Sequence, residues 1–173
     1  KQKLSIIVGS LVLAIALVLF IVLKNTNVKS DAERKLAEAK ILYGEGQTLL
    51  QGGKFQEGMN KLDQAIQIYP AFKNAYLFRG ETYQKRGDTY QVQQDYWHAI
   101  AEYDRLIQMT PQEAVAYYKK GECYFSLKEW DKAIQCLTLA IQFDANYIAA
   151  YEKRGNTYKQ RFQEKLDNAD FKK

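Results

Sequence analysis

The chain has 173 residues, of which 47% are hydrophobic and 26% charged, and its formal net charge is +5. This length fits one globular domain, or one domain with an anchor, and the near-average composition argues against collagen-like or disordered material. Two cysteines and one histidine are too few for a disulfide framework or a Cys/His metal cage, and the mild basicity gives no reason to expect nucleic-acid binding.

The first feature along the chain is an apolar run from Leu4 to Leu23, in which the only polar side chains are Ser5 and Ser10. As a helix, this run would span the roughly 30 Å hydrocarbon core of a bilayer. A cleaved signal peptide is the alternative, but signal peptides have shorter apolar regions and end in a small-residue cleavage site. We therefore expect residues 1–24 to form a single transmembrane helix.

Basic residues are more numerous after this run than before it. Two precede it and five follow within about 17 residues, namely Lys1 and Lys3, then Lys24, Lys29, Arg34, Lys35 and Lys40. The positive-inside rule then predicts that the C-terminal domain lies on the cytoplasmic, stromal or matrix-equivalent side.

Residues 25–30 have the composition of a short polar linker. Ser30 and Glu33 have the spacing of a capping box, in which each side chain bonds a backbone N–H at the start of a helix. We expect a helix to begin at Asp31 and the following domain to stay close to the membrane surface.

The remaining residues, 31–173, contain an internal repeat. Gly46, Gly80, Gly121 and Gly155 share one sequence context and are 34, 41 and 34 residues apart. After each of the first three glycines, at residues 55–66, 96–107 and 130–141, apolar residues recur at steps of three and four. We predict a pair of antiparallel helices in each unit, packed closely at the glycine.

Turn signals follow the predicted second helices. Pro70 and Pro111 end two of them, because proline cannot continue the helical hydrogen-bond ladder. In the third unit Asp144 and Asn146 are expected to form the turn.

These motifs resemble the tetratricopeptide repeat (TPR). The resemblance implies an all-α α-solenoid with repeats at about 39–72, 73–113 and 114–147 and a capping helix at 148–165. The leucine that the family places before the glycine is replaced by a charged residue that must be solvated or paired; the replacements are Glu45, Arg79, Lys120 and Arg154.

The second repeat is seven residues longer than the others. The surplus lies between Gly87 and Tyr96, where the two helices of the repeat should turn. Insertions in repeat proteins map to loops and can bind partners, although a solvated insertion without function is equally reasonable. Tyr90 and Val92 are the candidate contacts of this insertion.

Few residues are available for catalysis. His98 is the single histidine and is expected at a solvent-facing or partly packed position. Cys123 and Cys136 fall on the two helices of the third unit; a disulfide is conceivable there, but two buried thiols are favoured. Phosphate-loop, EF-hand and zinc motifs are lacking. We therefore expect no enzyme activity, cofactor, metal or small-molecule substrate.

The family resemblance also implies a binding surface, because TPR arrays line a concave groove with their first helices. On this chain the groove residues would be Tyr43, Gln47, Leu77, Phe78, Glu81, Lys85, Tyr118, Lys119, Glu122, Phe125, Lys153 and Asn156. Aromatic rings bordered by charged and amide groups are typical of protein-binding sites, unless neighbouring helices bury the rings. Some family members hold a chaperone's C-terminal carboxylate with Lys, Asn and Arg; of the matching positions only Lys119 fits, so we expect no such clamp.

The sequence thus favours a membrane-tethered scaffold or assembly factor for a membrane protein complex, with a partner peptide or helix in the groove. The alternative is a permanent accessory subunit of a large membrane complex. A basic stretch near the C-terminus could instead recruit an anionic partner, but acidic residues interrupt it.

Overall fold

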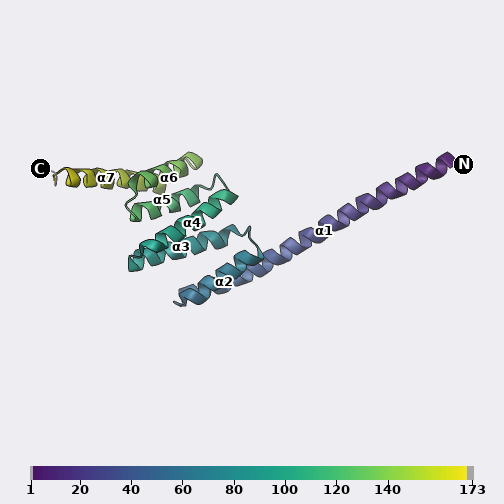
Figure 1. Cartoon of the computed structure of the whole chain (residues 1–173), viewed down its shortest axis with the longest axis horizontal. Helices are drawn as coiled ribbons and strands as arrows, with labels where there is room; N and C mark the ends of the chain where they lie inside the picture. The colour runs from purple at the N-terminus through teal and green to yellow at the C-terminus, as the bar shows by residue number, and fades with distance from the viewer. Residues whose placement is uncertain (1, 171–173) are drawn as a thin grey trace. The chain divides into compact units, whose positions relative to one another are not determined.

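The computed structural model describes the backbone of residues 2–170 and the side chains of residues 17–22, 24, 26 and 28–168. These residues form α-helices only, as expected (Figure 1). The helices are α1 (Gln2–Gln51), α2 (Phe55–Ile68), α3 (Lys73–Tyr90), α4 (Gln93–Met109), α5 (Ala114–Ser126), α6 (Trp130–Phe143) and α7 (Ile148–Asp170).

The chain divides into two compact units, Lys1–Pro70 and Ala71–Lys173. In the first unit α1 packs against α2. In the second unit α3 pairs with α4 and α5 with α6, and the contacts of α4 with α5 and of α6 with α7 join these elements into a stack (Figure 1). The predicted α-solenoid of antiparallel helix pairs is confirmed.

Helix α1 differs from the predicted N-terminal region. It is continuous from Gln2 to Gln51, so residues 25–30, predicted as a linker, are helical, and the helix start predicted at Asp31 is wrong. Neither proline nor glycine occurs between Lys24 and Gly44 to interrupt the hydrogen-bond ladder. Asp31 instead forms ion pairs one turn along the helix, at 2.6 Å from Arg34 and 3.1 Å from Lys35.

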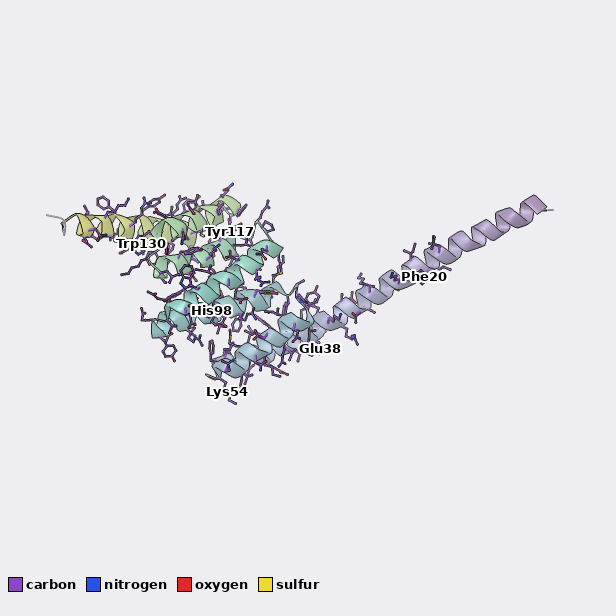
Figure 2. All side chains as sticks on the ribbon, in the orientation of Figure 1. Phe20, Glu38, Lys54, His98, Tyr117 and Trp130 are labelled. Carbon is purple, nitrogen blue, oxygen red and sulfur yellow. The ribbon has the colours of Figure 1, made fainter. Side chains whose placement is uncertain are left out.

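The predicted membrane segment, residues 1–24, falls largely outside the residues whose side chains are described. Over the described part of the chain, no helix meets the length and hydropathy needed to cross a membrane. Where side chains of the apolar run are described, at residues 17–22, all six are apolar and 48–64% exposed, among them Phe20 (Figure 2).

A glycine on the first helix of each pair receives a large side chain from the second helix. A Cβ added to Gly80 would lie 2.7 Å from the ring of Tyr103, and one added to Gly121 would lie 2.8 Å from Leu137. Tyr103 and Leu137 are both 0% exposed. The predicted close approach at the glycine is therefore observed, and the missing Cβ makes room for the buried residue.

The charged residue before each glycine has a polar partner, as the sequence required. These contacts are Glu45 with Lys61 at 2.6 Å, Arg79 with Glu102 at 2.7 Å, Lys120 with Asp104 at 2.5 Å, and Arg154 with the hydroxyl of Thr138 at 3.2 Å. At the end of α6, the backbone N–H of Asn146 donates to Asp144 and forms the expected turn.

The surplus of the second repeat is mostly helix rather than loop. Helices α3 and α4 have 18 and 17 residues, whereas α5 and α6 have 13 and 14. Only Gln91 and Val92 connect α3 to α4. The extended hairpin is held by Arg86, whose guanidinium donates to both carboxylate oxygens of Asp95 at 2.5 Å. The side chain of Asp95 is only 1% exposed.

Replacement of two glycines on α1, one at a time, tests whether the glycine in the repeat is needed for close packing of the two helices. A Cβ at position 46 would lie 3.0 Å from the backbone oxygen of Gly58 and 3.1 Å from Leu62, so Gly46→Ala should lower the free energy of unfolding by about 1–2 kcal/mol. A Cβ at Gly44 would meet nothing within 4 Å. Gly44→Ala should therefore raise the free energy of unfolding by about 0.5–1 kcal/mol, because alanine has the higher helix propensity. Urea unfolding followed by circular dichroism measures both; equal effects would contradict the packing role.

The pair of Arg86 and Asp95 gives a second prediction. Arg86→Ala leaves a carboxylate buried without its cation and should destabilise the protein by about 3 kcal/mol. The double variant Arg86→Ala/Asp95→Ala removes that charge and should be more stable than Arg86→Ala in the same denaturation experiment. A double variant less stable than Arg86→Ala would show that the carboxylate carries no such penalty.

Candidate functional site

The candidate site is the surface formed by the first helices of the second unit, α3, α5 and α7, which we call the first-helix face. Contacts join α3 to α5 and α5 to α7, so equivalent positions on these helices lie next to one another. The predicted groove residues on these helices are Leu77, Phe78, Glu81, Lys85, Tyr118, Lys119, Glu122, Phe125, Lys153 and Asn156.

Glu122 is the centre of a polar network on this face. Its carboxylate accepts a hydrogen bond from the Tyr118 hydroxyl at 3.1 Å and lies 3.5 Å from the ammonium of Lys119 and 3.7 Å from that of Lys153. Lys119 also lies 3.6 Å from Glu81, so the network joins α3, α5 and α7. Two carboxylates and two ammonium groups leave this patch without net charge.

The environment of Tyr118 keeps its hydroxyl protonated. Burial raises the pKa of Tyr118 to about 12, and the nearby carboxylate of Glu122 acts in the same direction. At neutral pH Tyr118 is therefore a hydrogen-bond donor to this carboxylate.

Aromatic side chains surround the network. The ring of Phe125 lies 4.4 Å from the ammonium of Lys153 and makes an edge contact with Trp130 at 5.3 Å between ring centroids. The rings of Tyr118 and Tyr147 are 4.9 Å apart. Phe125 and Tyr118 are half-buried, so their neighbours cover part of each ring and leave part of it accessible.

Tyr147 and Trp130 were not predicted as site residues. Tyr147 lies between α6 and α7, at the end of the third repeat. Its contact with Tyr118 depends on how α7 stacks on α5. Trp130 begins α6, in the next element after Phe125. Sequence spacing within one helix cannot identify such contacts between elements.

Three α3 residues of the predicted set have different surroundings. Leu77 packs partly against the buried cluster of α4 and α5 that includes Tyr103 and Cys123. Phe78 is half-buried, and Lys85 is exposed. Leu77 therefore contributes to the core as well as to the first-helix face.

The Glu122 network does not include the remaining predicted residues. Tyr43 and Gln47 are on α1 in the first unit, where the Gln47 amide donates to the Tyr43 hydroxyl at 3.0 Å. Asn156 on α7 is exposed. At the tip of the α3–α4 hairpin, Tyr90 is 71% and Val92 38% exposed.

The single histidine and the two cysteines lie on three different helices, α4, α5 and α6. His98 is exposed on α4 (Figure 2). Its ring lies 5.0 Å from that of Tyr83. Cys123 and Cys136 are free and buried, and burial raises the pKa of the Cys136 thiol to about 11. Over the described residues, no three His, Cys, Asp or Glu side chains are grouped to hold a metal ion.

The family model of the tetratricopeptide repeat matches residues 114–147, which hold α5, α6 and the turn that follows them. The chain thus contains a tetratricopeptide repeat. No curated protein matches the chain.

Several solved structures share its fold. MamA is 25% identical over 71% of this chain and 68% of its own, with a TM-score of 0.61. The first TPR domain of human RPAP3 is 14% identical over 75% of this chain and 96% of its own, with a TM-score of 0.64. The first TPR of Spaghetti (RPAP3), bound to the HSP90 peptide SRMEEVD, is 14% identical over 72% and 94%, with a TM-score of 0.62.

Proposed function

We propose that this protein is a protein-interaction scaffold that binds a peptide or helix of its partner on the first-helix face. We further propose that its apolar N-terminal run tethers it to a membrane, where it assists the assembly of a membrane protein complex. The observation that carries the binding proposal is the pair of half-buried rings, Tyr118 and Phe125, beside the polar network of Glu122.

The chemistry of this face defines the partner segment. The accessible parts of the aromatic rings offer apolar contact, while the carboxylates and ammonium groups offer hydrogen bonds that fix orientation. Because the charges on the face cancel, the partner that fits is an apolar or aromatic segment with polar flanks, not a strongly charged one.

A chaperone tail of the EEVD kind does not fit this face. The structurally similar Spaghetti domain is bound to the acidic HSP90 peptide SRMEEVD. In this chain the single matching cation, Lys119, lies between the carboxylates of Glu81 and Glu122. These carboxylates would repel an incoming acidic tail, and we propose binding without catalysis to a less charged segment.

Alanine substitutions on α5 test the binding site. Full-length protein carrying Tyr118→Ala and Phe125→Ala should bind the partner that co-purifies with the wild type at least thirtyfold more weakly, as expected for the loss of aromatic hot spots worth about 2 kcal/mol. The measurement is titration of the identified partner segment, with circular dichroism to verify that helicity is retained.

Two control variants locate the effect. Leu139→Ala, which changes an exposed apolar residue on α6, should bind like the wild type. Tyr90→Ala/Val92→Ala tests the hairpin tip. If the tip variant loses binding and the α5 variant does not, the first-helix face is not the site.

The membrane tether rests on the composition of the N-terminal run. Residues 4–23 lack charged side chains, and the described residues 17–22 are exposed and apolar on every side of α1. A helix that is apolar all round requires an apolar environment, which a bilayer provides. Because α1 continues as a helix from residue 24 onwards, the tether would be rigid. Residues 24–38, the helical segment that follows the apolar run, would extend over about 22 Å.

Charge substitution tests the tether. The wild-type chain should stay with membranes after a carbonate wash, and Leu13→Lys/Leu17→Lys should release most of it, since each lysine near the centre of a span costs about 2.5–3.5 kcal/mol. The control Val28→Lys/Ile41→Lys introduces the same charges at exposed apolar positions of α1 outside the run and should stay bound. Release of the wild type by the wash would refute the tether.

A further inference from the structure

The ring of Phe125, one of the two rings in the proposed binding site, contacts side chains of two other helices. The ammonium of Lys153 on α7 lies 4.4 Å from the centre of the ring, and the ring of Trp130 at the start of α6 meets it edge-on. All three side chains are half-buried. Because phenylalanine has no polar atom that a hydrogen bond could fix, the orientation of its ring depends on these neighbours.

Trp130 is itself held by α7. Its indole N–H donates to the carboxylate of Glu164 at 2.5 Å, and the next residue, Asp131, accepts a hydrogen bond from the guanidinium of Arg161. Arg161 and Glu164 are three residues apart and are therefore neighbours on the surface of α7. The residue before α6, Glu129, provides no side-chain cap, and the two contacts from α7 hold the first turn of α6.

One side of α7 makes both connections to the Phe125 ring. Lys153 and Glu164 are eleven residues apart, which is about three helical turns, so they lie on the same side of the helix. Thr157, between them on this side, is 0% exposed, so this side packs against the rest of the second unit. Helix α7 thus reaches Phe125 directly through Lys153 and indirectly, by way of Trp130, through Glu164.

We propose that Trp130 and Glu164 are positioning residues of the binding site. The carboxylate of Glu164 fixes the indole, and the indole fixes the ring of Phe125 in the orientation that meets the partner. Without Glu164 the indole can turn away, and the ring of Phe125 gains a freedom that binding must then remove at a cost in affinity. This inference rests on the proposed function of the first-helix face, since it assigns two further residues to that site.

Intrinsic fluorescence tests the first step without a partner. The chain has two tryptophans, so Trp97→Phe leaves Trp130 as the single emitter. In this full-length background, in one mild detergent, acrylamide should quench Trp130 more strongly in Glu164→Ala than in Glu164→Gln, because glutamine keeps a carbonyl oxygen for the indole N–H. The control Asp167→Ala removes an exposed carboxylate whose hydrogen bond is to Gln163 of the same helix, and it should leave quenching unchanged. Equal quenching in the two Glu164 variants would refute the bond to the indole.

Peptide binding tests the second step. The probe is a peptide selected from a random phage-displayed library because it binds the wild-type chain and does not bind Tyr118→Ala/Phe125→Ala. Glu164→Ala should bind this peptide about fivefold more weakly, as expected for the loss of one hydrogen bond, and Glu164→Gln should bind it like the wild type. Trp130→Phe keeps a ring beside Phe125 but has no N–H, so adding Glu164→Ala to it should cause no further loss.

The outcomes separate this inference from the proposed function. Binding of the peptide by Glu164→Ala with wild-type affinity overturns the inference and leaves the proposed function intact. Losses from Trp130→Phe and Glu164→Ala that multiply in the double variant also overturn it, because the two residues would then act independently. If no peptide meets the selection criterion, the proposed binding site is refuted, and the positioning role with it.

Discussion

The contact between a glycine and a large buried side chain is the interaction on which the rest of the structure depends. At Gly80 and Gly121 the first helix has no Cβ, so Tyr103 and Leu137 fill the space and become fully buried. Each such contact brings two helices close enough to exclude water from their shared surface. The spacing within the pairs in turn fixes how neighbouring pairs stack, and thereby which side chains meet on the first helices.

The first-helix face follows from that stacking. Glu122 meets Lys119 on its own helix through the helical repeat, but it meets Lys153 only because α7 lies beside α5. The resulting network has no net charge, which separates this surface from one built to hold an acidic tail. Its aromatic rings are partly covered by Tyr147 and Trp130, and this leaves an only partly apolar surface.

The second repeat and α7 show what happens when the repeat is altered. The seven-residue surplus lengthens α3 and α4 instead of forming a loop, and the buried pair of Arg86 and Asp95 holds the extended hairpin. In α7 the pattern of a first helix is retained, but a Cβ added to Gly155 would meet nothing within 4 Å. The same pattern thus gives a core in one place and an exposed surface in another.

The sequence by itself determined the helical repeat, its glycine contacts and the ends of the second helices, because these depend on spacing within one or two adjacent helices. The resemblance to the TPR family also placed Tyr118, Lys119, Glu122 and Phe125 together on a first helix, and their role in binding stays a prediction. Only the tertiary structure decided that Leu77 packs against the core and that Tyr147 joins the site. It also decided that α1 runs unbroken through residues 25–30. These outcomes depend on competing partners in space, which spacing along a chain does not encode.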